Sequence, residues 1–394
     1  MRRLCQELNN PESAFPVIHV AGTNGKGSVC YMLDAIFREH GYEVGLFTSP
    51  HLFELGERVQ VNAKPLAFAR IEYWTEKLRD MVNGMQKGNP SWIPSFFEWM
   101  TAIAFLEFKH RKVDIAVIET GLGGRLDSTN VVDPLVSVIT SIGLDHCDVL
   151  GSSLKNIATE KAGIIKSGKP VVTGWLEPEA EQSILEVALH RNAPVHLLNN
   201  LSEDEFPKTN LEGSFQRRNG ALACKVSELL ESSFSLVSEK THSALQKVSL
   251  AGRWQKFSYQ PLIILDACHN GHGAKASGEL WNTLPEDAEI WFAACGMERA
   301  SEILALLSKR FSRFTFFEMD QPRACSHEEL MGALGDVSDS VVFAQEKDIP
   351  VLLDKLSSSS SLLVTGSIYL ISSFLVHKRG TMKNKVTANW QDRW

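Results

Sequence analysis

Short apolar runs alternate with longer, more polar stretches along most of the chain, and no internal repeat stands out. Apolar runs bounded by turn-forming residues predict buried strands, and their alternation with helices is typical of stacked βαβ units with a mainly parallel sheet. In the first part of the chain we predict six strands, at Phe15–Ala21, Glu43–Thr48, Lys112–Glu119, Leu135–Thr140, Lys169–Thr173 and Pro194–Leu198.

Helices are predicted between these strands. One begins near Lys26 and ends near His40, where a glycine follows, and another covers about Ser214 to Glu231. The stretch from residue 231 to residue 252 is polar and contains several serines, so we place a domain boundary there.

A second α/β set follows the predicted boundary. Its predicted strands are Leu262–Asp266, Glu289–Ala293, Phe314–Glu318, Val341–Ala344 and Ser361–Thr365, with helices in the gaps. We therefore expect one domain over residues 1–250 and a smaller one over residues 251–394.

Composition and charge exclude several classes of protein. The 394 residues include 44% hydrophobic and 22% charged residues, as in an ordinary soluble globular protein. The net charge of −7 supplies no overall basic field for nucleic acid. Seven scattered cysteines without a CxxC pair favour a reducing compartment over disulfides or a cysteine zinc site. Because there is neither a membrane-length apolar run nor a signal-peptide h-region, we expect a cytoplasmic protein.

The segment from Ala21 to Ser28 (AGTNGKGS) lies between a predicted buried strand and a predicted helix. Glycines allow a tight turn with inward N–H groups, the helix N-terminus adds positive potential, and Lys26 adds a full charge, which together form a phosphate cradle. The segment departs from the usual G-x-x-x-x-G-K-[ST] form, because Val20 takes the first glycine position and Gly27 follows the lysine. The alternative interpretation is a plain glycine turn.

Polar residues follow other predicted strands. Glu119 ends a strand and precedes a glycine-rich turn, His146 follows the next strand after Asp145, and Asp266 ends the first strand of the second set. Ligands of open α/β sheets bind beyond the carboxyl ends of strands, where a carboxylate can hold Mg²⁺ against phosphates. Taken one at a time, such a glutamate or histidine also fits a structural role, and Lys161 fits a solvated position on a helix.

Together these segments resemble the folylpolyglutamate synthase/dihydrofolate synthase family of the Mur ligase superfamily. The matching segments are HVAGTNGKGS, TSPHL with Glu57-Arg58 after it, ETGLGGRLDSTN, TSIGLDH, EKAGIIK, AGRWQ, LDACHN and TGSIYL. Their order and spacing agree from about residue 10 to residue 376. The GTNGKGS segment is shared across the superfamily, whereas GLGGRLDSTN and SPHL are more specific to folate ligases. The resemblance implies a P-loop, Mur-ligase-type central domain followed by a smaller Rossmann-like glutamate-ligase domain.

The resemblance also implies a role for each matching residue. The implied ATP contacts are Thr23, Asn24, Gly25, Lys26, Gly27, Ser28, Asn219, Arg253, Asp266 and His269. The implied magnesium ligands are Ser49, Glu119 and His146, together with Lys161 as a carbamate that helps to place a second magnesium. The implied pteroate pocket is lined by Ser95, Phe96, Phe97, Glu98, Leu126, Asp127 and Ser128. Lys26, Glu119, His146 and Lys161 are then the expected catalytic residues.

The implied activity is ATP-dependent addition of L-glutamate to folate or dihydropteroate through an acyl-phosphate, by a monomer that uses Mg²⁺. Sequence leaves open whether the first glutamate is added, the glutamate tail is extended, or both. A Mur-type ligase of cell-wall precursors is an alternative, and so is a P-loop ATPase without ligase activity.

Two regions depart from the family pattern. Family members carry a longer segment before the phosphate loop, and we interpret Met1–Leu4 as the end of that segment, with a misassigned start codon. A truly shorter protein would bind folate more weakly and still bind ATP. The segment GMERAS at residues 296–301 replaces an acidic and lysine-bearing loop, and Cys268 replaces a common alanine.

Overall fold

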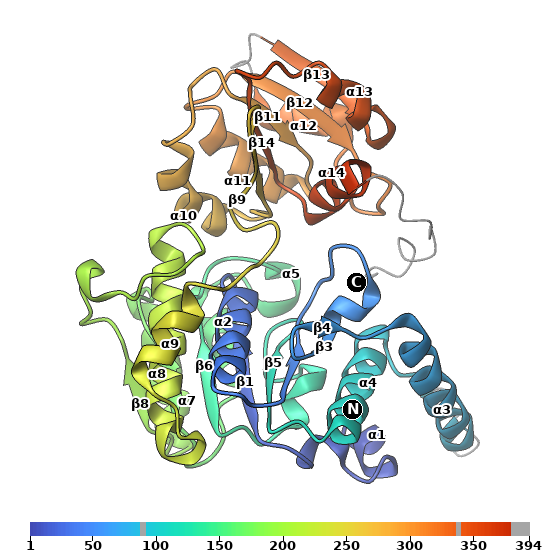
Figure 1. Cartoon of the computed structure of the whole chain (residues 1–394), viewed down its shortest axis with the longest axis vertical. Coiled ribbons are helices and arrows are strands. Elements are labelled where there is room, and N and C mark those ends of the chain that lie inside the picture. The colour runs from blue at the N-terminus through green and yellow to red at the C-terminus, as the bar shows by residue number, and fades with distance from the viewer. Residues whose placement is uncertain (87–91, 336–339, 380–394) are drawn as a thin grey trace.

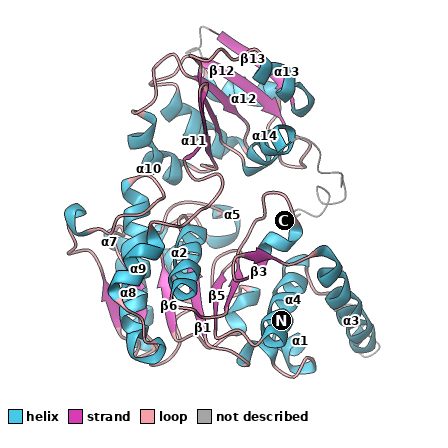
Figure 2. Cartoon of the chain, in the orientation of Figure 1, coloured by secondary structure: helices cyan, strands magenta, loops and turns pink. Residues whose placement is uncertain are grey.

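The computed structural model describes residues 1–86, 92–335 and 340–379. The chain forms two α/β units, each built around its own sheet, and the second unit sits above the first in Figure 1. Helices lie on both sides of the strands in each unit (Figure 2). The predicted α/β class is therefore confirmed.

The first sheet has eight strands in the order β4-β3-β2-β5-β1-β6-β7-β8. Its strands are β1 (Val17–Ala21), β2 (Val44–Phe47), β3 (Val59–Val61), β4 (Lys64–Pro65), β5 (Ile115–Glu119), β6 (Val136–Ile139), β7 (Val171–Thr173) and β8 (Val195–Leu197). Along this order, the strands from β2 through β5, β1, β6 and β7 to β8 pair in parallel. Strands β3 and β4 add an antiparallel edge next to β2. Strands covered on both faces need apolar residues at successive positions, which explains the continuous apolar runs.

Helices cover the first sheet in two layers. The helices of this unit are α1 (Arg2–Glu7), α2 (Lys26–Glu39), α3 (Phe68–Gln86), α4 (Phe96–Arg111), α5 (Cys147–Leu150), α6 (Leu154–Ala162), α7 (Pro178–His190), α8 (Ser214–Phe234) and α9 (Ser238–Leu245). One core joins α2, α8 and α9 to a sheet face that includes Ile18 and Val20. A second core joins α1, α3 and α4 to the opposite face, which includes Val17 and Ile118. The alternation of neighbouring positions between faces thus assigns β1 to two cores.

The second sheet has six strands in the order β13-β12-β11-β14-β10-β9, all parallel except β9. The strands are β9 (Gln255–Tyr259), β10 (Leu262–Asp266), β11 (Glu289–Phe292), β12 (Arg313–Glu318), β13 (Ser340–Gln345) and β14 (Ser361–Thr365). The helices are α10 (Gly271–Trp281), α11 (Met297–Leu307), α12 (His327–Leu334), α13 (Ile349–Asp354) and α14 (Ile368–Arg379). Helices α10 to α12 pack on one face of the sheet, and α13 and α14 pack on the other.

All eleven predicted strands are present, within three residues at either end. The pattern missed the antiparallel strands β3, β4 and β9, of which β3 and β4 are short and β9 is a half-exposed edge strand. The predicted boundary segment contains α9, which packs into the first unit's core, and the domain division at residue 250 stays a prediction. Among the described residues, no helix combines the length and apolarity that crossing a bilayer requires.

Candidate active site

The glycine-rich turn between β1 and α2 is held by the end of β6. The Thr23 N–H donates to the carbonyl of Ser141 at 2.7 Å, and the Asn24 N–H donates to the Ser141 hydroxyl at 3.0 Å. Gly22 has φ +154°, and a Cβ there would lie 1.9 Å from Thr140 Oγ1. Only glycine fits so close an approach. The turn leads directly into α2, whose first N–H groups have no intrahelical partners and favour an anion.

The α8 residue Asn219 touches this turn. Gly25 has φ +86°, and a Cβ there would lie 2.6 Å from Asn219 Oδ1. Asn219 is buried and its amide donates to Gln216 Oε1 at 3.0 Å, which fixes its orientation. Further along, Ser28 is buried within the first turn of α2. The predicted nucleotide residues of the first unit therefore converge.

Two lysines share one carbonyl oxygen in the turn. Lys26 Nζ donates to Gly22 O at 3.1 Å and to Thr23 O at 3.2 Å, and Lys161 Nζ donates to Gly22 O at 2.9 Å. Lys161 is buried, and this burial, followed by the positive charge of Lys26, lowers its pKa to about 7. The uncharged amine of Lys161 is thus favoured relative to that of an ordinary lysine.

Glu119 ends β5 on the other side of the turn. Its Oε2 accepts the Ser49 N–H at 3.2 Å and would lie 3.7 Å from a Cβ at Gly27. Burial raises the pKa of Glu119, while the charges of Lys26 and Arg253 act to lower it. A buried carboxylate at this position is stabilised by positive charge, whether from a lysine or from a metal ion.

His146 follows β6 with a left-handed backbone (φ +53°), and its N–H donates to Asp145 Oδ1 at 3.0 Å. Burial lowers the pKa of His146 to about 4, so the ring is neutral and has a nitrogen lone pair free to accept. Within the described residues, no three His, Cys, Asp or Glu side chains converge as a metal site. The predicted ligand set contains only two residues of those types, Glu119 and His146, so it stays a prediction.

The second unit presents its own strand end to the first. Asp266 ends β10 and is buried, and its Oδ2 accepts the Ser277 hydroxyl at 3.1 Å. Burial raises the pKa of Asp266 and the charge of Arg253 opposes that shift. The charge of Arg253 also acts to lower the pKa of Glu119 in the first unit, and the charge of His269 acts to lower the pKa of Asp145. The predicted nucleotide residues of both units therefore surround one region.

Direct hydrogen bonds join the two units at this place. Asn24 Nδ2 donates to Asn270 Oδ1 at 3.0 Å and lies 2.9 Å from His272 Nδ1, while Asn270 Nδ2 donates to Asn24 Oδ1 at 3.1 Å. Asp145 accepts Asn270 Nδ2 at 2.9 Å and the Arg299 guanidinium at 2.5 Å. Burial opposes the charge of Asp145, but His269 and Arg299 lower its pKa to about 2.

Sequence reasoning did not assign Asn270, His272 or Arg299 to the site, although Asn270 ends the matching segment LDACHN. Their positions on α10 and α11 become informative only once the two sheets are placed together. The single available signal was that each follows a strand end in the second unit.

A separate cavity of about 470 Å³ in the first unit gathers most of the predicted pteroate residues. Its lining includes Ser95, Phe97, Glu98, Leu126, Asp127 and Ser128, together with the glycine-rich turn after β5. Phe96 is not part of this lining, and Arg58 lies over its ring at 5.3 Å from the centroid. Helical geometry separates it from Phe97, since neighbouring residues on a helix face different sides.

Two of these residues also have local structural roles. Ser95 caps α4 by accepting the Glu98 N–H at 3.2 Å, and Glu98 Oε2 accepts the Ser95 N–H at 2.8 Å. This reciprocal capping box fixes the start of α4 at the cavity wall.

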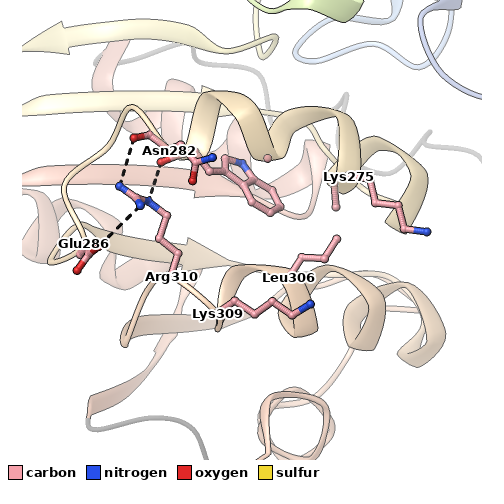
Figure 3. A pocket seen from close by; sticks show the side chains of 9 residues that line it. Lys275, Asn282, Glu286, Leu306, Lys309 and Arg310 are labelled. Carbon is pink, nitrogen blue, oxygen red and sulfur yellow. Dashed lines mark hydrogen bonds and ion pairs between the residues drawn. The ribbon is translucent and has the colours of Figure 1, made fainter.

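A second cavity of about 480 Å³ lies between α10 and α11 (Figure 3), and none of the predicted site residues lines it. Arg310, at its edge, donates to the carbonyl oxygens of Trp281, Asn282 and Leu284, which occupies its guanidinium. The remaining cations, Lys275 and Lys309, are exposed. These features indicate a packing groove between helices.

Comparison with known proteins identifies the family. Residues 94–242 match the Mur ligase middle domain. A dihydrofolate synthase/folylpolyglutamate synthase of Bacillus subtilis is 35% identical over 401 residues, which cover 94% of this chain and 92% of the relative. An Escherichia coli protein of the same name is 32% identical over 90% of this chain and 85% of its own length. The chain belongs to the dihydrofolate synthase/folylpolyglutamate synthase family.

A solved structure agrees over nearly the whole length. The folylpolyglutamate synthase of Mycobacterium tuberculosis, complexed with ADP and AMPPCP, superposes with a TM-score of 0.85 at 29% identity and covers 96% of this chain and 94% of its own. This agreement includes both α/β units, so the Mur-ligase architecture extends across the chain.

The ion pair between the units of this family member gives a first prediction. We expect Asp145→Asn to loosen the contact, because Arg299 loses a charged partner worth about 1.5–3 kcal/mol. Since 1.4 kcal/mol is about ten-fold in an equilibrium, the ratio of separated to docked units should rise more than ten-fold. Small-angle X-ray scattering without ligand should then report a larger radius of gyration. Lys225→Gln, which removes an exposed pair within α8, is the control, and an unchanged radius for Asp145→Asn would contradict the prediction.

Proposed function

We propose that this protein is an ATP-dependent ligase that joins L-glutamate to the carboxylate of a folate or dihydropteroate through an acyl-phosphate. The observation that carries the proposal is the convergence of the phosphate turn with its two lysines, the buried Glu119 and the strand end of β10. Family membership supports it, since relatives are named for this activity and an E. coli relative was solved in complex with DHPP and ADP.

The proposed reaction has two steps. A carboxylate is a poor acyl donor because oxide does not leave, so its oxygen first attacks the γ-phosphorus of ATP and ADP leaves. The amine of glutamate then attacks the acyl carbon, the C–N bond forms, phosphate leaves and the nitrogen loses a proton. Lys26 and the α2 N-terminus stabilise the charge on the moving phosphoryl group, and no enzyme nucleophile is needed.

The residues present fit a magnesium ion. The buried Glu119 carboxylate and the neighbouring Ser49 are oxygen donors, which Mg²⁺ prefers, and burial of Glu119 makes a nearby cation favourable. Glu119, Ser49 and His146 would hold such an ion, and Lys161 would help to place a second. When bound, Mg²⁺ neutralises phosphate charge and so favours transfer.

Carbamylation of Lys161 is supported by its surroundings. An amine must be uncharged to react with CO₂, and the pKa of Lys161 is lowered to about 7 by burial and then by Lys26. The reaction forms a bond between Nζ and the CO₂ carbon and releases a proton. A carbamate carries a negative charge, which Lys26 beside it would stabilise, whereas the two ammonium groups repel each other.

The cavity of about 470 Å³ in the first unit supports the position of the pteroate-type substrate. Asn24, Asn270 and Asp145 draw the second unit towards the phosphate turn, and such closure would exclude water that hydrolyses an acyl-phosphate. We propose that the protein acts as a monomer.

The central experiment measures phosphate release with ATP and Mg²⁺ while dihydropteroate, tetrahydrofolate and glutamate are offered in all combinations. The ligase predicts release that requires both a pteroate substrate and glutamate, with a product heavier by glutamate residues in mass spectrometry. Release that is indifferent to both substrates would instead favour an ATPase, and release that requires a cell-wall precursor would favour another Mur-type ligase.

Lys26→Ala should lower kcat by about 10²-fold or more, because it removes a full charge from the moving phosphoryl group. The coupled phosphate assay measures this. Lys247→Ala, which alters an exposed lysine paired with Glu39, is the matched control. A near-normal rate for Lys26→Ala would remove the turn from the reaction.

Glu119→Gln should raise the magnesium concentration for half-maximal rate by about ten-fold or more, because a neutral amide replaces the carboxylate ligand. A magnesium titration of the ligation rate measures this. Glu318→Gln, which changes a half-exposed glutamate at the end of β12, should leave the titration unchanged. If the two variants titrate alike, Glu119 is not a ligand.

Lys161 gives a prediction about carbon dioxide. After incubation with ¹³C-bicarbonate at pH 8, above the lowered pKa of about 7, the protein should show a carbamate signal in ¹³C NMR. The signal should fade as pH falls below 7, since the protonated amine does not react. Lys161→Arg keeps the positive charge and should lack the signal, and an equal signal in both proteins would refute carbamylation.

A further inference from the structure

A buried histidine in β1 has no part in the phosphate site. His19 is fully buried in the middle of the first sheet, next to strands β5 and β6. An imidazole placed there needs a hydrogen-bond partner, and its Nε2 lies 2.8 Å from Thr129 Oγ1. Its Nδ1 is buried without a hydrogen-bond partner among the described residues. The Thr129 contact is therefore the polar interaction that this histidine keeps.

The direction of the hydrogen bonds follows from Thr129. Its hydroxyl donates to Asp127 Oδ1 at 2.5 Å, so its oxygen is free only to accept, and His19 Nε2 carries the donated hydrogen. Burial, followed by the charge of Lys166, lowers the pKa of His19 to about 3, so the ring is neutral with its proton on Nε2. His19 thus donates to Thr129, and Thr129 donates to Asp127.

Asp127 is the last acceptor in this series of hydrogen bonds. It also holds the glycine-rich turn that follows β5. Its Oδ1 also accepts the Thr129 N–H at 2.9 Å, and its Oδ2 accepts the N–H groups of Gly121 at 2.9 Å and Leu122 at 3.0 Å. Two donors on each oxygen fill the usual capacity of a carboxylate. Leu122, Asp127 and the residues between them line the cavity of about 470 Å³.

The turn has little room to shift. A Cβ on Gly121 would lie 2.5 Å from the Phe97 ring, so its backbone is pressed against a wall of the same cavity. A rotation of the Asp127 carboxylate would release two backbone N–H groups and move the turn. The shape of this cavity therefore depends on the hydrogen bond from His19 that orients Thr129.

We propose that His19 is a positioning residue which, through Thr129 and Asp127, holds the turn that forms the wall of the substrate cavity and so sets affinity for the pteroate-type substrate. This inference rests on the proposed function. It gives His19 a role at the substrate cavity, which the residue itself does not line, although its strand β1 leads into the phosphate turn.

Thr129→Val tests the proposal, because it keeps the shape and removes the hydroxyl between His19 and Asp127. We expect the KM for dihydropteroate or tetrahydrofolate to rise about ten-fold or more, with the KM for ATP changed less than two-fold. Thr129→Ser, which retains a hydroxyl, should restore most of the affinity. Thr173→Val removes another buried hydroxyl, bonded to Ile139 O at 2.8 Å away from the cavity, and should leave both KM values unchanged.

A second pair of variants tests the same proposal if Thr129→Val does not fold. His19→Leu removes the donor but leaves Thr129 bonded to Asp127, so the KM for the pteroate substrate should rise several-fold. His19→Gln supplies an amide N–H at a similar reach and should recover it. Wild-type KM values in His19→Leu, or equal rises in the KM for ATP, would overturn the proposal.

The same experiments separate this inference from the proposed function. If the wild type ligates and the variants keep their affinities, only the positioning role fails. If the wild type does not ligate, calorimetric binding of dihydropteroate decides: weaker binding by Thr129→Val supports the positioning role, and equal binding or no binding by either protein overturns it.

Discussion

The site depends on the carbonyl oxygen of Gly22, which accepts hydrogen bonds from the Nζ atoms of both Lys26 and Lys161. Lys161 is buried, and this burial, followed by the positive charge of Lys26, lowers its pKa to about 7. The turn can bring the two lysines together because Gly22 presses its backbone against Thr140, where a side chain would collide. Packing of the turn against the end of β6 therefore brings two lysine side chains to one carbonyl oxygen.

The same turn connects the two units. Asn24, in the phosphate turn, exchanges amide hydrogen bonds with Asn270. Asn270 also donates to Asp145, and it caps α10 by accepting the Gly273 N–H at 2.8 Å. An amide that is fully bonded across an interface cannot change partners without moving that interface. Events at the phosphate turn and the orientation of the second unit are thus physically linked.

Much of the fold could be predicted from sequence because strands buried on both faces must be apolar throughout. Edge strands escape that rule: β4 consists of the exposed Lys64 and Pro65, and its pattern resembles a loop. Site residues at strand ends could also be predicted from sequence, since the topology of the sheet alone brings those ends together. Arg299 could not, because its partner Asp145 lies 154 positions away, and only the docking of the two sheets makes them neighbours.

His19 marks the limit of what a pattern can say. In sequence it is a polar interruption of an apolar strand, which is equally consistent with a tolerated core residue and with a functional one. In the structure, the Thr129 hydroxyl donates its one hydrogen to Asp127. The histidine must then supply the other hydrogen, and under our proposal this bond orients the turn at the cavity wall through Asp127. Under our proposal one strand serves two sites: its carboxyl end leads into the phosphate turn, and His19 acts on the cavity of the first unit through Thr129 and Asp127.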